Sequence, residues 1–217
     1  MKYASVTEHL AGLGSDKWVL HAAAQKRAAE GHRILNLTIG EPDVPTPAVL
    51  IDTACAAMQS GRTGYSNGRG ENSLLSALST RYSDRLGRPI GRDRFLCLPG
   101  TQTSLYLVFR ALCEPGDEVI LGDPMYATYE GLIRASGATP VPVRLRDDAG
   151  FRLRAEDVEA AITPSTRVIF LNTPHNPTGA ILRAEDLQAI GEVAKKHDLW
   201  IVSDEVYGDL THDNRPY

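Results

Sequence analysis

The strongest constraint on the fold is a set of short apolar runs that alternate with segments of helical pattern. Four continuous runs are typical of strands buried on both faces, at 95–98, 119–121, 168–171 and 199–203. Further strands are predicted over 34–39 and 141–145. Because such strands need helices on both faces of the sheet, the pattern predicts parallel βαβ units. We therefore expect an α/β fold of three layers, α/β/α, around a mostly parallel sheet.

The predicted helices lie between these strands and begin or end at recognisable signals. They cover residues 16–30, 47–61, 74–86, 101–113, 127–136, 155–162 and 183–197. Gly31 and Gly87 follow two of them, as glycine commonly does at a helix end. The segment 40–47 holds three prolines and predicts irregular structure.

Composition excludes several classes of function. The 217 residues carry a formal charge of −4, which provides no basic surface for nucleic acid. No apolar run approaches the roughly 20 residues that span a bilayer, and the first residues lack the apolar core of a signal peptide. The three cysteines are widely spaced, and no Cys/His pair has metal-ligand spacing. We expect a cytoplasmic protein with no metal site and no nucleic-acid or membrane partner.

Functional residues are expected where the strands end, because open parallel sheets bind ligands beyond the carboxyl ends of their strands. After 95–98, Gly100, Thr101 and Gln102 open a helix. Such a turn either presents backbone N–H groups to a phosphate or is a plain strand-to-helix connection with a threonine cap. After 119–121, Tyr126 is placed either to stack on a planar ring or to pack beneath a helix.

The two later strands are followed by polar residues. After 168–171, two X-Pro bonds stiffen the segment around Asn176, so its amide is a candidate hydrogen-bond donor, whereas His175 is expected to be a bystander. After 199–203, Asp204 either pairs with a protonated heterocyclic nitrogen or caps the next helix, and Tyr207 would reach the same ligand. Together these residues supply a phosphate cradle, a stacking ring, an amide donor and a carboxylate. That set matches pyridoxal 5'-phosphate.

The order and spacing of these motifs resemble the N-terminal half of class I/II aminotransferases, the aspartate-aminotransferase-like group of fold type I. The resemblance implies that Gly100, Thr101 and Gln102 form the phosphate loop and that Tyr126 stacks on the pyridine ring. It also implies an incomplete, cofactor-binding large domain of that fold over 47–217, preceded by an N-terminal arm, 1–46, that belongs to the small domain.

Five further positions take roles from the resemblance. Asp204 would face the pyridine nitrogen, and Asn176 and Tyr207 would donate to the cofactor's phenolic oxygen. Gly40, in the stretch 39–43, would contact the substrate through its backbone. Tyr65, followed by a glycine at 70, would reach the cofactor phosphate of a neighbouring subunit, which predicts a homodimer.

The implied reaction transfers an amino group from an amino acid to a 2-oxo acid, with Asp204 and Tyr207 as catalytic residues. The family also needs a Schiff-base lysine some way after the turn that holds these residues. None of the lysines occupies that place; they are Lys2, Lys17, Lys26, Lys195 and Lys196. The resemblance further implies that a strand over 95–98 lacks its sheet neighbours in a chain that stops at Tyr217. We therefore expect the chain to be the N-terminal half of an aminotransferase that folds poorly and is inactive by itself.

Three alternatives stay open. A pyridoxal-phosphate carbon–sulfur β-lyase of the same fold shares the motifs around Asn176 and Asp204. A non-catalytic sensor domain of a transcription regulator has the same fold, although the acidic chain has no basic region before its fold-type-I pattern. A remnant that binds the cofactor without a covalent link is the third. The amino donor is also open among aspartate, aromatic, basic and alanine-type amino acids.

Overall fold

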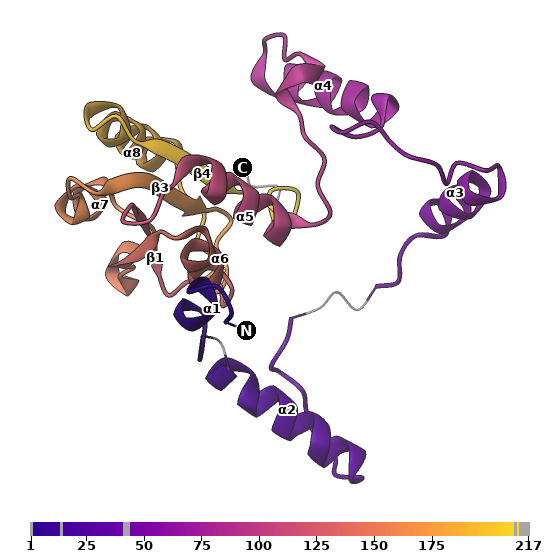
Figure 1. The fold of residues 1–217 in the computed structure, drawn as a ribbon, viewed down its shortest axis with the longest axis horizontal. Coiled ribbons are helices and arrows are strands. Elements are labelled where there is room, and N and C mark those ends of the chain that lie inside the picture. The colour runs from indigo at the N-terminus through magenta and orange to yellow at the C-terminus, as the bar shows by residue number, and fades with distance from the viewer. Residues whose placement is uncertain (1, 14, 41–43, 211, 213–217) are drawn as a thin grey trace. The chain divides into compact units, whose positions relative to one another are not determined.

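The computed structural model describes residues 2–13, 15–40, 44–210 and 212. The chain divides into two compact units, one comprising Met1–Val19 with Gly100–Tyr217 and the other Leu20–Pro99. Figure 1 traces the chain through both, and their positions relative to one another are not determined. The predicted domain boundary at 46/47 concerns the family's two domains and stays a prediction.

The first unit is built on a parallel sheet. Its strands are β1 (Glu118–Asp123), β2 (Thr139–Arg144), β3 (Thr166–Asn172) and β4 (Trp200–Asp204). Their order across the sheet is β2-β1-β3-β4, and every neighbouring pair is parallel. The register pairs Asn172 with Asp204, so β3 and β4 end side by side. The predicted parallel sheet is confirmed in the described residues.

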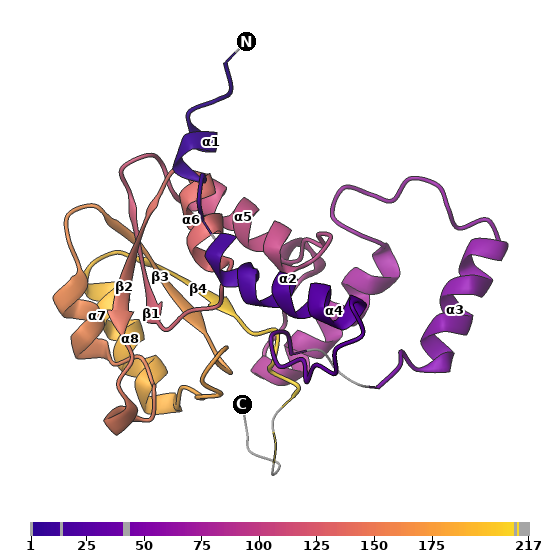
Figure 2. The ribbon, with the colours of Figure 1, turned by 90° about the horizontal axis from the view of Figure 1, so that it is seen from below.

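Helices cover both faces of this sheet, as Figure 2 shows. The sheet helices are α5 (Thr101–Leu112), α6 (Tyr129–Ser136), α7 (Ala155–Ala161) and α8 (Ala184–Lys196). Alternate residues of β1 and β3 enter two separate apolar cores, because successive strand side chains point to opposite faces. Leu121 and Phe170 join the core that includes residues of α5 and α6, whereas Ile120 and Ile169 join that of α7 and α8. The three-layer α/β/α prediction is thereby confirmed.

Shorter elements complete the first unit and shape its surface. They are α1 (Val6–His9) and a 3₁₀ turn, η2 (Asp147–Ala149). None of the helices in the described ranges is both long and apolar enough to cross a bilayer.

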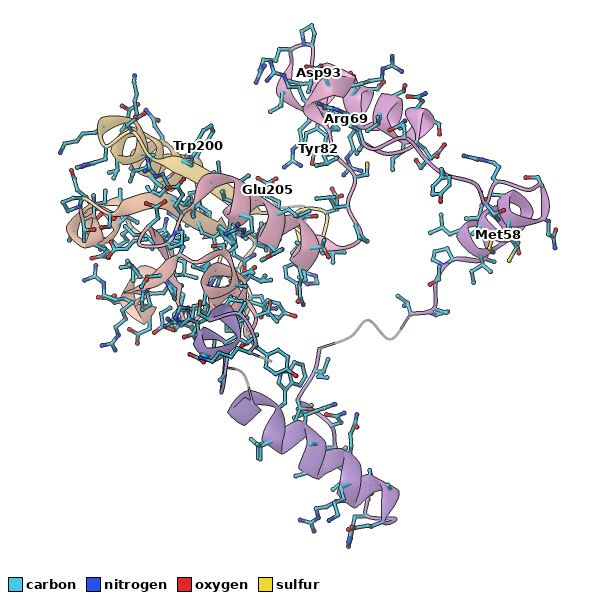
Figure 3. The ribbon with its side chains drawn as sticks, viewed as in Figure 1. Met58, Arg69, Tyr82, Asp93, Trp200 and Glu205 are labelled. Atoms are coloured by element: carbon cyan, nitrogen blue, oxygen red, sulfur yellow. The ribbon has the colours of Figure 1, made fainter. Side chains whose placement is uncertain are left out.

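The second unit consists mainly of helices. α2 (Ser15–Ala29) enters it from the first unit, and α3 (Ala48–Gln59), α4 (Asn72–Leu86) and the 3₁₀ turn η1 (Arg92–Arg94) follow. As predicted, Gly87 ends α4 in a left-handed conformation, φ +62°. Arg69 donates from Nη1 to the carbonyl of Asp93 at 2.6 Å, and the rings of Tyr82 and Phe95 lie 5.5 Å apart (Figure 3).

Two predicted strands are wrong. Residues 34–39 and 95–98 form no strand, and Leu37 and Leu96 are 92% and 58% exposed. A run of apolar residues becomes a strand only when a neighbour pairs with its backbone groups. In the described residues the ladder partners of the sheet are β1 to β4 alone. The N–H of Cys97 instead donates to the carbonyl of Arg69, at 2.8 Å.

The last strand is predicted correctly, but its burial is not. β4 pairs with β3 and stands at one edge of the described sheet. Trp200 and Ile201 are 58% and 40% exposed, and Figure 3 labels Trp200 on this strand. An edge strand has a neighbouring strand on one side only, so fewer residues surround its side chains. An apolar sequence therefore does not guarantee burial on both faces.

Candidate functional site

The candidate site is built around Asp204, the last residue of β4. Its side chain is buried, and both carboxylate oxygens accept hydrogen bonds. The hydroxyl of Tyr129 donates to Oδ2 at 2.9 Å, and the backbone N–H of Val206 donates to Oδ1 at 3.1 Å. A buried carboxylate is tolerated only with such partners. The structure therefore places Asp204 as a fixed acceptor at the carboxyl end of the sheet, where the sequence predicted a functional carboxylate.

Tyr129 is a residue of the candidate site to which the sequence analysis assigned no role. Its ring is buried and packs edge-on against Tyr126 and Phe170, at centroid distances of 5.4 and 4.7 Å. Burial, with the Asp204 carboxylate as the second cause, raises the pKa of the Tyr129 hydroxyl well above its ordinary value. The hydroxyl thus keeps its proton and acts as a donor. The sequence offered one signal for this residue, which is a second tyrosine three residues after Tyr126, in the first turn of a predicted helix.

Asn176 and Tyr207, predicted to share a ligand, are neighbours. The amide nitrogen Nδ2 of Asn176 donates to the hydroxyl of Tyr207 at 3.2 Å. Asn172 links this pair to Asp204, because its Oδ1 accepts from the backbone N–H of Asn176 at 2.8 Å and its Nδ2 donates to the carbonyl of Asp204 at 3.2 Å. Asn172 was not singled out in the sequence, although its place at the end of a strand could have suggested it.

The predicted phosphate loop opens α5. Gly100 has φ +87°, a backbone conformation that glycine adopts readily, and a Cβ there would meet nothing within 4 Å. The first-turn N–H groups that follow lack partners within the helix and are available to an anion. Gln102 and Thr128, which lies just before α6, line the same cavity of about 330 Å³. Thr128 Oγ1 is buried without a hydrogen-bond partner among the described residues.

Two predicted site residues belong to the other unit. Gly40 and Tyr65 are exposed, Tyr65 completely, and both lie between Leu20 and Pro99. Residues 41–43, which complete the motif around Gly40, lie outside the described residues. The structure therefore brings Tyr126, Asn176, Asp204 and Tyr207 into one network through Tyr129 and Asn172. The roles predicted for these residues, and those of Gly40 and Tyr65, stay predictions.

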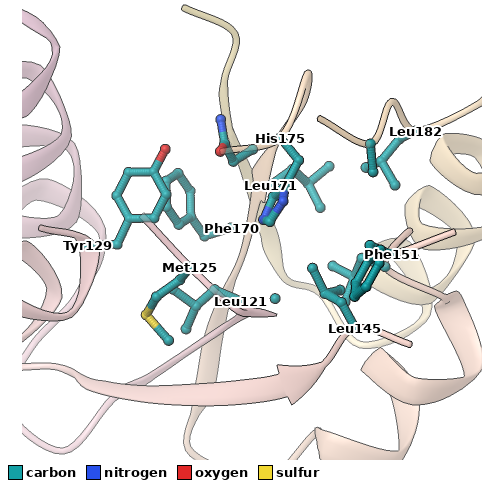
Figure 4. Close-up of a pocket in the computed structure, with 13 residues that line it drawn as sticks. Leu121, Met125, Tyr129, Leu145, Phe151, Phe170, Leu171, His175 and Leu182 are labelled. Atoms are coloured by element: carbon teal, nitrogen blue, oxygen red, sulfur yellow. The ribbon is translucent and has the colours of Figure 1, made fainter. Parts of the chain in front are cut away.

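A small apolar pocket adjoins the site (Figure 4). It has a volume of about 30 Å³ and is lined by Leu121, Leu145, Phe151 and His175, among other residues. That volume suits about two water molecules, so the pocket is too small to hold a coenzyme. In the described residues, no group of three or more His, Cys, Asp or Glu side chains could hold a metal ion.

Comparison with known proteins identifies the family. The profile of the family described as "Aminotransferase class I and II" matches residues 32–216. The chain belongs to this family. Among curated aminotransferases, it is 42% identical over 213 residues to an arginine–pyruvate transaminase of Pseudomonas aeruginosa, covering 98% of the chain and 54% of that protein. It is 35% identical over 188 residues to an aspartate aminotransferase of Sulfolobus acidocaldarius, covering 86% and 47%.

Solved aminotransferase structures share the fold. An aspartate aminotransferase of Thermus thermophilus with maleate superposes with a TM-score of 0.92 at 30% identity, covering 100% of the chain and 56% of that structure. An alanine aminotransferase of Pyrococcus furiosus gives 0.91 at 26% identity, covering 99% and 55%. The chain thus spans about half the length of the relatives it matches.

Proposed function

We propose that the chain forms the coenzyme-binding half of a pyridoxal-phosphate-dependent aminotransferase acting on an amino acid and a 2-oxo acid. The observation that carries the proposal is the network that joins buried Asp204 to Tyr129 and, through Asn172, to Asn176 and Tyr207. Asn172 and Asp204 end the adjacent parallel strands β3 and β4, and α/β sheets bind ligands at the carboxyl ends of their strands.

The donors and acceptors present fit the proposed cofactor. Asp204 supplies the anion that would keep the pyridine nitrogen protonated, and the bond from Tyr129 holds that carboxylate in place. Asn176 and Tyr207 supply hydrogen-bond donors for the phenolic oxygen, and the start of α5 supplies N–H groups for the phosphate. Thr128 adds a buried hydroxyl with no partner among the described residues. When bound, the cofactor's ring accepts electrons from the substrate's α-carbon.

We propose arginine with pyruvate as the first substrate pair to examine. The supporting observation is the 42% identity, over nearly the whole chain, to an arginine–pyruvate transaminase. Identity to the aspartate aminotransferase of Sulfolobus acidocaldarius is lower, at 35%. This ranks a basic amino donor ahead of the other classes that the sequence left open.

The resemblance predicted poor folding, but the two apolar cores around the sheet favour a folded first unit. We therefore expect the 217 residues by themselves to bind the cofactor without a covalent link and without turnover. None of the five lysines lies in the place that the family resemblance implies for the Schiff-base lysine. A homodimer in which Tyr65 contacts the neighbouring subunit's cofactor, and a cytoplasmic location, complete the proposal.

Titration of the 217-residue chain with pyridoxal 5'-phosphate, followed by absorbance, tests this proposal. We expect saturable binding that dialysis reverses even after borohydride treatment. Asp204→Asn should weaken binding about 10- to 100-fold, because a hydrogen bond to a charged group contributes about 1.5–3 kcal/mol. Asp148→Asn, at an exposed aspartate of η2, is the matched control and should bind like the unchanged chain.

Several results would contradict parts of the proposal. Absence of saturable binding would rule out the cofactor, and borohydride-resistant attachment would rule out the non-covalent mode. Formation of alanine from arginine and pyruvate would overturn the expected inactivity. Release of ammonia from a cysteine conjugate, without amino transfer, would favour the carbon–sulfur β-lyase.

A further inference from the structure

The side chain of Asn172, at the end of β3, contacts the backbone on both strand ends of the candidate site. Its Oδ1 accepts from the backbone N–H of Asn176 at 2.8 Å. Its Nδ2 donates to the carbonyl of Asp204 at 3.2 Å and to that of Pro174 at 3.4 Å. Asp204 lies 32 positions away in the sequence, at the end of β4. One amide group therefore connects the loop after β3 with the neighbouring strand.

Only one orientation of this amide satisfies the contacts. A backbone N–H only donates and a carbonyl only accepts, so the side-chain oxygen faces Asn176 and the side-chain nitrogen faces Asp204. An aspartate at position 172 would keep the first contact and lose the second, whereas an alanine would lose both. Asparagine is thus the side chain of this size that serves both partners.

The two contacts differ in how readily another group replaces them. The carbonyl of Asp204 also accepts from the backbone N–H of Thr173, at 3.2 Å. The N–H of Asn176 has no second acceptor among the residues that the structure describes. Removing the Asn172 side chain would leave the Asp204 carbonyl with one donor and the Asn176 N–H with no acceptor. We therefore expect the larger effect at Asn176.

The backbone of Asn176 determines where its own side chain lies. The side-chain Nδ2 of Asn176 donates to the hydroxyl of Tyr207 at 3.2 Å, and Tyr207 follows Asp204 by three residues. The amide donor and the buried carboxylate consequently belong to two different strand ends. Asn172 contacts the backbone of both residues.

We propose that Asn172 is a positioning residue that sets the spacing between the amide donor of Asn176 and the carboxylate of Asp204. The consequence for the cofactor rests on the proposed function, in which Asp204 faces the pyridine nitrogen and Asn176 faces the phenolic oxygen. Both atoms belong to one rigid ring, so the two protein groups must keep a fixed separation to contact both. The coupling between the strand ends rests on the printed distances alone.

The first measurement uses the 217-residue chain without cofactor and follows amide hydrogen exchange by NMR. Asn172→Ala should speed exchange of the Asn176 N–H about tenfold, the effect of one hydrogen bond. Exchange at Ile169, in the buried middle of β3, should change much less, because the loss is local. Asn172→Asp, which keeps the acceptor, should restore slow exchange at Asn176.

The second measurement adds pyridoxal 5'-phosphate to the same proteins. A donor directed at the phenolic oxygen favours its ionised form and lowers the pKa of that hydroxyl. Asn172→Ala should therefore raise, by about one pH unit, the pH at which the absorbance of the bound cofactor reports this ionisation. Binding should also weaken about tenfold. A general loss of stability would not move the pH midpoint.

Asn67→Ala is the matched control for both measurements. The Oδ1 of Asn67 also accepts from two backbone N–H groups, those of Arg69 and Gly70, both at 2.9 Å. Asn67 lies in the other unit of the chain. Its removal should leave the exchange of Asn176 and the absorbance of the bound cofactor unchanged.

Three outcomes would overturn the inference. The first is exchange at Asn176 that Asn172→Ala leaves unchanged, and the second is equal acceleration at Asn176 and Ile169. The third is exchange of Asn176 in the unchanged chain as fast as in an unfolded one, which decides the matter even if a variant fails to fold. If the unchanged chain binds no cofactor, the proposed function fails while the exchange still measures the coupling. If the chain binds and Asn172→Ala shows the same affinity and pH midpoint, the positioning role alone fails.

Discussion

The two units of the chain differ in what happens to their apolar residues. From Gly100 to Asp204, the apolar strands and helix faces meet in two cores, with Phe109, Ile120, Ile133 and Ile169 fully buried. From Leu20 to Pro99, Leu75 is the one buried residue among those described. α3 is rich in alanine and branched apolar residues, yet none of its residues is buried. The helix α3 has an apolar sequence without burial, because burial requires a second surface that faces the helix.

The largest expected effect is on the free energy of unfolding, when a core side chain of the first unit is truncated. Phe170 contacts the rings of Phe109 and Tyr129 and is almost completely buried. Phe170→Ala should lower the free energy of unfolding by about 3–5 kcal/mol, measured by urea denaturation. Ile51→Ala, at a residue of α3 that is 49% exposed, should change it by less than about 0.5 kcal/mol. Equal losses would show that α3 is packed as tightly as the sheet and would remove the contrast.

The two units should also differ in the reactivity of their cysteine thiols. Burial, reinforced by the nearby Asp117, raises the pKa of the Cys113 thiol to about 11, whereas Cys55 lies exposed on α3. At pH 8 a thiol with that pKa is only about 0.1% thiolate, the reactive form. Iodoacetamide should therefore modify Cys55 at least about 100-fold faster than Cys113, as followed by mass spectrometry of peptides. Similar rates at pH 8 would contradict the burial of Cys113.

A smaller effect is expected from removing tyrosine hydroxyls. Tyr129→Phe leaves Oδ2 of buried Asp204 without its donor and should cost about 1–3 kcal/mol of unfolding free energy. Tyr65→Phe, at a fully exposed side chain of the other unit, should cost less than about 0.5 kcal/mol. A neutral Tyr129→Phe would show that the Asp204 carboxylate does not depend on this bond.

Prediction from sequence succeeded where local pattern and burial agree. The strands at 119–121 and 168–171 were found because each is apolar along its length and lies between helices, and both are buried in the structure. The equally apolar run at 95–98 gave a wrong prediction, because it has no ladder partner in the described sheet. A strand depends on hydrogen bonds to a distant segment, which local composition does not report.

Within the site, the sequence predicted residues that are proposed to contact a ligand, but not the residues that hold those side chains in place. Asp204, Asn176 and Tyr207 stand at strand ends, a position that can be located from the order of elements alone. Tyr129 donates to a residue 75 positions away, and Asn172 to one 32 positions away. Such partners become visible only when the register of β3 and β4 brings Asn172 beside Asp204.

By itself, the sequence predicted the longer helices, the four strands of the sheet together with two that do not form, the parallel arrangement and the residues at the strand ends, because side-chain periodicity and turn chemistry act over a few neighbouring residues. The tertiary structure decided which apolar surfaces are covered, which strand stands at the edge, and which groups support Asp204 and Asn176. Those outcomes depend on contacts between segments that are far apart in the chain. Hydrogen bonds and apolar burial between such segments stabilise the fold only once folding has brought the segments together.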